Sequence, residues 1–160
     1  MKKIALFLSL ILIVFLFVNC SKKVVFDEKV FFPDANWTFE NKAITFETLF
    51  TGSDKPFSII LELDLIGTSN VDKFYATFSI FSPSGGETVK SILFNLNNPQ
   101  EPYIQGGSPN EKTYRLIVYP KKYFPESGTY TFIVDQYSNK ADNYGIRALR
   151  MYVEKVKENK

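Results

Sequence analysis

Ser58-Ile-Ile-Leu-Glu-Leu-Asp-Leu-Ile66 is the stretch with the most regular alternation in this chain. Every second side chain is apolar and falls on one face of an extended strand: Ile59, Leu61, Leu63 and Leu65. The opposite face carries Ser58, Glu62 and Asp64. We expect the first face to lie in a core and the second to face water.

Seven other segments have apolar spacing typical of strands and are closed by turn residues. They cover residues 24–32, 44–50, 74–81, 89–96, 114–119, 129–135 and 146–156. This pattern predicts an all-β fold, an antiparallel β-sandwich of about eight strands and of jelly-roll or Greek-key type. An immunoglobulin-like sandwich is the second choice.

The first 20 residues have the layout of a bacterial lipoprotein signal peptide. Lys2 and Lys3 form a basic start, an apolar run covers residues 4–18, and Asn19 precedes Cys20, the single cysteine. Cleavage would leave Cys20 as an N-terminus that carries acyl chains such as palmitate. The alternative is a retained signal anchor, but the apolar run is shorter than the roughly 20 residues that a spanning helix needs.

The leader divides the chain into a signal peptide over residues 1–19 and one sandwich domain over residues 20–160. Phe17 and Asn19 depart from the usual lipobox, which has small residues just before the cysteine. Ser21 follows the cysteine in place of an aspartate, which by known sorting rules permits transfer to the outer membrane. We expect an outer-membrane lipoprotein that faces the periplasm rather than the cell surface.

Composition excludes several classes of function. The chain has no histidine, and its single cysteine is assigned to lipidation, so the usual zinc ligand sets and histidine-activated nucleophiles are absent. Without Lys2 and Lys3, 17 basic residues balance 17 acidic ones, so no net charge attracts nucleic acid. Carboxylate-only catalysis and an oxygen-ligand calcium site stay open on composition, because Asp and Glu are scattered along the chain, but neither has a recognisable motif. We expect a protein that is not an enzyme and needs no metal or other cofactor.

One long polar loop is a candidate binding site. Tyr103, Gly106 and Gly107 combine an aromatic ring with flexible backbone, and loops on rigid scaffolds often carry binding. The alternative is that Tyr103 folds back and closes one end of the sandwich.

Three other residues are expected to be structural. Trp37 fits a core or sheet-end anchor better than a platform for a sugar ring. Gly128 would supply a turn with positive φ, and the Tyr130 hydroxyl would bond a loop carbonyl across a corner. In the last segment, the spacing of Arg147 and Arg150 places them on opposite faces of a regular strand. Either both are solvated edge charges, or one points inward and needs an acidic partner.

Several segments together resemble the gliding motility lipoprotein GldH family. The residues that carry the resemblance are Phe32, Asn36, Trp37, Phe46, Asp72, Phe74, Tyr75, Phe78, Pro83, Asn98, Pro99, Tyr103, Gly106, Gly107, Phe124, Gly128, Tyr130, Phe132, Gln136, Gly145, Ile146, Leu149, Met151, Val153, Glu154 and Lys155. Tyr103 replaces the more usual Trp, and Arg150 and Tyr152 depart from the usual Gly and Arg of that family.

The resemblance implies a non-enzymatic envelope lipoprotein associated with gliding motility and with secretion across the outer membrane. Its partners would be the membrane, reached through the lipid, and other envelope proteins, docked through long loops and an edge strand. The alternative is a surface carbohydrate-binding or adhesion lipoprotein, because jelly-roll sandwiches often bind glycans through aromatic loops.

Overall fold

The computed structural model describes residues 23–67, 69–96, 103–106, 108–138 and 140–156. The predicted signal peptide and Cys20 lie outside the described residues. Strands make up nearly all of the regular structure. The elements are β1 (Val24–Phe31), the short 3-10 helix η1 (Pro33–Ala35), β2 (Ala43–Ile66), β3 (Lys73–Phe81), β4 (Glu87–Asn95), β5 (Tyr103–Gln105), β6 (Glu111–Gln136) and β7 (Ile146–Lys155). All the strand pairs are antiparallel, which confirms the predicted all-β sandwich.

Two long strands replace four of the predicted ones. The segments predicted at 44–50 and 58–66 are the two halves of β2, and those predicted at 114–119 and 129–135 are the two halves of β6. Turn residues between the halves bend each strand without ending it. β5 is a short additional strand that pairs with β6.

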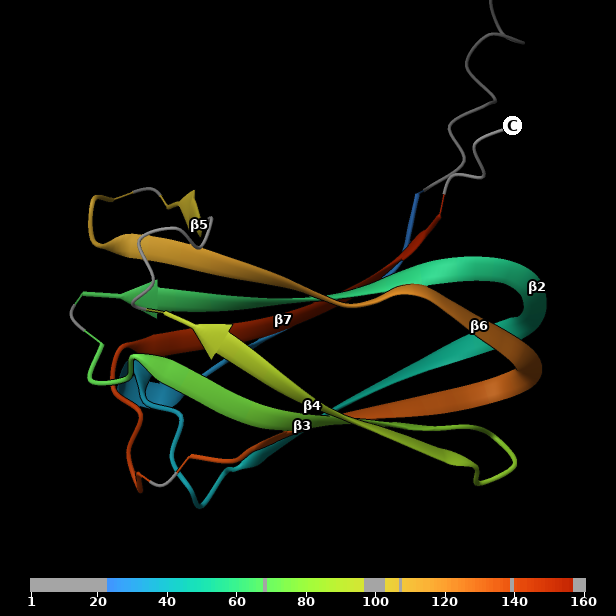
Figure 1. Cartoon of the computed structure of the whole chain (residues 1–160), viewed down its shortest axis with the longest axis horizontal. Helices are drawn as coiled ribbons and strands as arrows, with labels where there is room; N and C mark the ends of the chain where they lie inside the picture. The colour runs from blue at the N-terminus through green and yellow to red at the C-terminus, as the bar shows by residue number, and fades with distance from the viewer. Residues whose placement is uncertain (1–22, 68, 97–102, 107, 139, 157–160) are drawn as a thin grey trace, which may run out of the picture.

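The paired strands β2 and β6 run through both layers of the sandwich (Figure 1). In one layer, which we call sheet I, the second half of β2 lies between β7 and the first half of β6, and β1 is outermost. In the other layer, sheet II, the first half of β2 pairs with the second half of β6, followed by β3 and β4. The bend in the ribbon therefore joins the two sheets at one end of the sandwich.

Extra residues on β2 produce the bend. Ser53 pairs with Phe124, but Phe57 pairs with Lys122, so three residues of β2 lie opposite one residue of β6. Such bulges bend a strand and increase its twist. Gly52 has a φ of +72°, and a Cβ there would lie 3.0 Å from the carbonyl oxygen of Pro125. Both the conformation and the close approach favour glycine.

Aromatic rings fill the inside of the bend. The ring of Phe124 stacks on Phe50 with centroids 4.0 Å apart, and it contacts Phe57 and Tyr130 at 5.6 and 4.9 Å. Such ring pairs contribute about 0.5–1.5 kcal/mol beyond their buried area.

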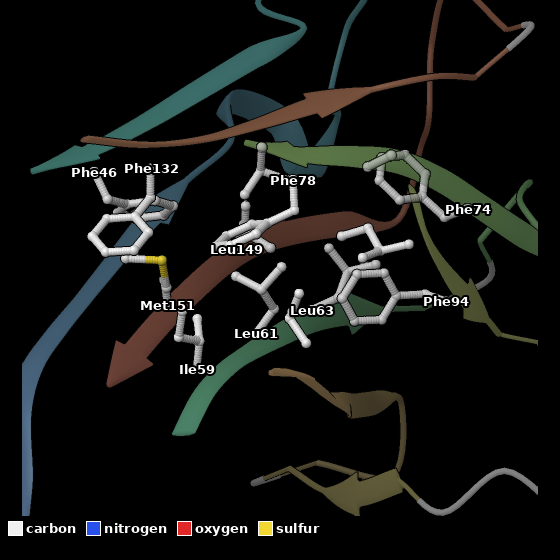
Figure 2. Packing of buried hydrophobic residues seen from close by; sticks show 14 of the residues in the cluster. Phe46, Ile59, Leu61, Leu63, Phe74, Phe78, Phe94, Phe132, Leu149 and Met151 are labelled. Carbon is white, nitrogen blue, oxygen red and sulfur yellow. The ribbon is translucent and has the colours of Figure 1, made fainter. Parts of the chain in front are cut away.

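Further along, the inner faces of the sheets meet in one cluster (Figure 2), in which Phe78 and Phe132 of sheet II lie opposite Leu61 and Leu149 of sheet I. Every member of the cluster lies between Phe26 and Val153.

Trp37 lies at the other end of the core and is fully buried. Its ring packs against Phe32 and Phe74 with centroids 4.7 and 4.9 Å away, and its indole N–H donates to the carbonyl of Asn41 (2.9 Å). The side-chain amide of Asn143, also fully buried, donates to the backbone carbonyl of Trp37 (2.8 Å). Trp37 is thus held on both its apolar and its polar sides, as a structural anchor requires.

Gly128 and Tyr130 lie inside β6, not at a turn that precedes a strand. Gly128 has a φ of +139°, and a Cβ there would come within 2.8 Å of the Pro83 ring. The Tyr130 hydroxyl accepts a hydrogen bond from the backbone N–H of Glu126 (3.2 Å), whereas we expected it to bond a loop carbonyl. The Tyr130 hydroxyl therefore makes its hydrogen bond as an acceptor and not as a donor, because β6 stays extended and presents a backbone N–H at this position.

The aromatic cluster in the bend predicts a large effect of Phe124→Ala. Removing a fully buried phenylalanine should lower the free energy of unfolding by about 3–5 kcal/mol. Tyr123→Ala is the matched control, because its half-exposed neighbouring ring should cost about 0.5 kcal/mol or less. Urea unfolding of both variants measures the difference, and equal losses would contradict the role of the bend cluster.

Candidate functional site

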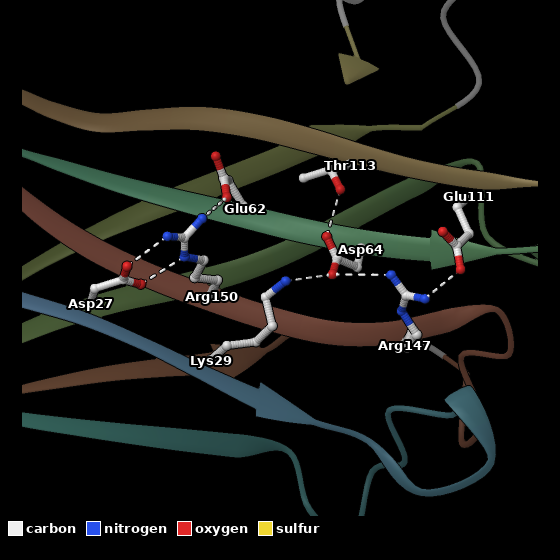
Figure 3. A network of polar contacts seen from close by, with 8 residues as sticks. All are labelled: Asp27, Lys29, Glu62, Asp64, Glu111, Thr113, Arg147 and Arg150. Carbon is white, nitrogen blue, oxygen red and sulfur yellow. Dashed lines mark hydrogen bonds and ion pairs between the residues drawn. The ribbon is translucent and has the colours of Figure 1, made fainter. Parts of the chain in front are cut away.

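A network of ion pairs covers the outer face of sheet I (Figure 3). The Arg150 guanidinium donates to both carboxylate oxygens of Asp27 (2.7 and 2.6 Å) and to Glu62 (3.0 Å). Beside it, Asp64 accepts from the Lys29 ammonium at 2.9 Å and from the Thr113 hydroxyl at 2.6 Å. These residues come from β1, β2, β6 and β7, so the network crosses the whole width of the sheet.

Glu62 and Asp64 correct the prediction that this face of β2 is wet. Their relative exposures are only 8% and 3%. β2 is a central strand of sheet I, so long side chains from the neighbouring strands cover its outer face as well. Alternation in the sequence separates the two faces, but it does not report how many neighbours each face has.

Arg147 and Arg150 lie on the same face, contrary to the prediction for a regular strand. Asp64 pairs with Ala148 and Leu65 pairs with Ile146, so a bulge leaves Arg147 as an extra residue and changes the alternation. The Arg147 guanidinium lies 2.7 Å from Glu111 and 3.5 Å from Asp64. Both arginines are about one-third exposed and have acidic partners, so neither is a freely solvated edge charge.

The network lowers the pKa values of two carboxyl groups. Hydrogen bonds from Arg150, opposed by partial burial, lower the pKa of Asp27. Burial raises the pKa of Asp64, but hydrogen bonds from Thr113 and Lys29, together with the charges of Lys29 and Arg147, outweigh burial and lower it overall. Burial and the nearby charge of Glu62 raise the pKa of the Tyr152 hydroxyl to about 12, so this hydroxyl stays protonated and neutral beside Glu62.

The charged side chains of this face are engaged with one another. Each carboxylate drawn in Figure 3 is held in an ion pair with a lysine or an arginine. Within the described ranges, no three acidic, histidine or cysteine side chains are grouped so as to hold a metal ion. The described residues also contain no helix with the length and hydropathy of a membrane span.

β4 presents the most regular outer edge of the sandwich. Its nine residues pair with β3 without a register shift, and no described residue pairs with its other side. At one end the Leu96 N–H donates to the Asp72 carbonyl (2.7 Å), and at the other the Ser82 N–H donates to the Gly86 carbonyl (2.8 Å). Along a strand, the backbone N–H and C=O groups of successive residues point to opposite sides. Those of the even-numbered residues of β4 therefore point toward β3. The backbone groups that point away from β3 belong to Glu87, Val89, Ser91, Leu93 and Asn95.

Exposed apolar side chains accompany this free edge. Val89 and Leu93, on the outer face of β4, are 56% and 41% exposed, and Tyr75 on β3 is exposed beside Leu93. On the inner face, the Lys90 ammonium donates to the Val118 carbonyl of β6 at 2.7 Å and lies 5.0 Å from the Tyr119 ring centroid. Lys90 therefore holds β4 in place while its outward backbone groups stay accessible.

β1, the outermost strand of sheet I, is a poorer template for pairing. A register shift between Val24 and Phe26 breaks its regular edge, and Asp27, Glu28 and Lys29 are charged. Bulges and charges of this kind protect edge strands from pairing with other chains. β7, for which edge charges were one of two alternatives, lies between β1 and β2 and has no free edge. Of the two strands that end the path of paired strands, β4 is therefore the better template for a docking edge.

The predicted binding loop is only partly described. Tyr103 is 45% exposed and packs against the ring of Tyr114, with centroids 5.9 Å apart, while the Lys112 ammonium lies 4.9 Å from its ring. Gly106 donates its N–H to the Glu111 carbonyl (2.9 Å), and a Cβ at Gly106 would come within 2.4 Å of the Glu111 side chain. Gly107 lies outside the described residues. Tyr103 thus lies along a sheet edge with one half of its ring open to solvent.

Comparisons with known proteins identify no family. No protein-family model matches the chain, and no curated protein matches it. Among solved structures, the chain is similar to a carbohydrate-binding module specific for non-crystalline cellulose, CBM28, at 12% identity and a TM-score of 0.43, over 81% of this chain and 70% of that one. It is also similar to VP2 of an infectious bursal disease virus subviral particle, at 14% identity and a TM-score of 0.40, over 80% of this chain and 32% of VP2. The chain thus spans about a third of the length of that VP2 chain.

The ion-pair network predicts a loss of stability in acid. Because the pKa values of Asp27 and Asp64 are lower in the folded than in the unfolded protein, the unfolded state binds more protons as the pH falls. The two carboxylates contribute fully to the free energy of unfolding above about pH 5. This contribution is lost as the pH falls below the ordinary aspartate pKa of about 3.9 and then through the lower pKa values of the folded protein. Urea unfolding at a series of pH values should show this loss. Asp64→Asn should flatten the dependence, and an unchanged slope would contradict the role of Asp64.

Proposed function

We propose that this chain is a non-enzymatic envelope lipoprotein, anchored through Cys20, whose sandwich docks another envelope protein at the β4 edge. The resemblance to the gliding motility lipoprotein GldH family supports a partner from the motility or secretion machinery. The observation that carries the docking role is the free, regular edge of β4, compared with the bulged and charged edge of β1.

The docking mode that fits β4 is strand addition. An extended partner segment would pair with the outward N–H and C=O groups, which supply affinity regardless of side chains. Side chains of that segment on the outer face would lie beside Val89 and Leu93, so alternate apolar residues in the partner would improve the fit. The formal neutrality of the chain without its leader agrees with recognition by backbone and apolar groups.

A proline in β4 tests strand addition. Ser91→Pro removes an outward N–H and places a ring on the pairing edge. The hydrogen bonds to β3 stay intact, because the backbone N–H and C=O groups of Ser91 point away from β3. We expect pull-down of envelope proteins by the tagged chain to be abolished, with the free energy of unfolding changed by about 1 kcal/mol or less.

Ser91→Thr is the matched control, because it keeps the N–H and suits a strand. It should recover the same partners as the wild-type chain. If the folded Ser91→Pro protein also recovers them, docking uses another surface and strand addition at β4 is wrong.

The anchor is tested separately. Cells grown with an alkyne analogue of palmitate should label the wild-type protein, and Cys20→Ser should abolish both the label and the recovery in outer-membrane fractions. Labelling that survives the substitution would contradict lipidation at Cys20.

Protease treatment of intact cells distinguishes the two orientations. A periplasmic docking protein should be protected until the outer membrane is opened. Cleavage on intact cells, combined with failure to recover any envelope protein, would instead favour the alternative of a surface carbohydrate-binding or adhesion lipoprotein.

A further inference from the structure

A pocket opens on the side of the sandwich where β1 faces the first half of β2. Its volume is about 680 Å³, within the range of about 300–1,000 Å³ that is usual for small-molecule sites. Phe50 and Phe57 are buried at its floor, and Val25, Leu49, Pro56 and Val156 add apolar surface. We call it the β2 groove.

Residues of both sheets line the groove, at the point where β2 passes from one sheet to the other. Val25 is the extra residue in the β1 bulge, and Gly52 begins the bend that carries β2 from sheet II to sheet I. The half-buried Thr48 alternates with the buried Phe46 and Phe50, so it lies on the inner face of β2 and lines the groove, where a larger side chain would fill the space. Open apolar surface of this kind normally marks a binding site in a soluble domain.

Two lysines line the groove. Lys55 and Lys155 are exposed, and no acidic side chain among the described residues lies within ion-pair distance of either ammonium. The nearby carboxylate of Glu154 is engaged by Lys23 at 3.0 Å. Asp54, in the bend, precedes Lys55 in sequence but does not line the groove. An apolar interior beside unpaired cations is complementary to an amphiphile with an anionic head group.

The groove also lies where the N-terminal segment joins the fold. The Lys23 carbonyl accepts from the Lys155 N–H (2.8 Å), and the Val156 N–H donates to the Pro56 carbonyl (3.1 Å). Cys20 precedes Lys23 by three residues, so it attaches within about 12 Å of this corner, given at most about 3.6 Å per residue. An anchor at Cys20 would hold this end of the sandwich close to the lipid head groups.

We propose that the β2 groove binds an acyl chain of an anionic membrane phospholipid, with Lys55 and Lys155 placed at its phosphate group. The biological setting rests on the proposed anchoring at Cys20, but the chemistry of the groove does not. This contact would add a non-covalent attachment to the covalent one and would fix the orientation of the sandwich on the membrane.

The test uses a chain that starts at Ser21, which retains every described strand and every core residue. Its valine and leucine methyl groups are labelled for NMR, and lysophosphatidylglycerol is added below its micelle concentration. We expect saturable shifts at Val25, Leu49 and Val156, with Val89 and Leu93 on β4 unaffected. Lysophosphatidylcholine, with the same chain and no net charge, should bind more weakly, and glycerol 3-phosphate alone should not bind.

Paired variants make the result specific. Thr48→Trp should fill the groove and abolish binding, whereas Thr48→Val should leave the groove open and bind as well as the wild type. Lys55→Gln with Lys155→Gln should weaken binding about fivefold for each lysine removed. Absence of shifts, equal shifts at Val89 and Leu93, or wild-type binding by folded Thr48→Trp would overturn the proposal. Because this chain lacks Cys20 and needs no partner, its result is independent of the labelling and pull-down experiments.

Discussion

The pairing of β2 with β6 is the interaction on which the rest of the structure depends. Both strands pass through both sheets, so the same ladder of hydrogen bonds holds the two layers together at the bend. Gly52 permits the change of direction, and the ring of Phe124 fills its inside against Phe50. Since no disulfide can form from a single cysteine, this bend must be stabilised by packing and backbone hydrogen bonds alone.

The central position of β2 in sheet I also explains the ion-pair network. A strand with partners on both sides has its outer face covered by their long side chains, so its carboxylates lose water. Glu62 and Asp64 are tolerated there because Arg150, Lys29 and Thr113 supply charged or polar partners. Removing one partner from a buried pair is far more costly than removing an exposed pair. The network therefore favours one register of β1, β2 and β7 over its alternatives.

Sequence patterns predicted the inner face of the sandwich well and its outer face poorly. The alternation from Ser58 to Ile66 correctly placed Ile59, Leu61 and Leu63 in the core, because inner residues must be apolar whichever strands cover them. The burial of Asp64 depends on partners 35 and 49 residues away, and local alternation carries no information about them. The same limit applies to β7: its apolar composition fits a strand, but only the pairing order shows that it lies between β1 and β2.

The two proposed contacts lie at opposite ends of the strand order. β1, beside the β2 groove, is the first strand of the path β1-β7-β2-β6-β3-β4, and β4 is the last. A lipid in the groove and a strand added to β4 would therefore not compete for the same surface. Because β1 and β4 belong to one continuous hydrogen-bonded path of strands, fixing the groove against a membrane would also fix the direction in which the β4 edge faces. An anchored sandwich of this kind would present its docking edge to a partner in one orientation, which reduces the rotational freedom lost on binding.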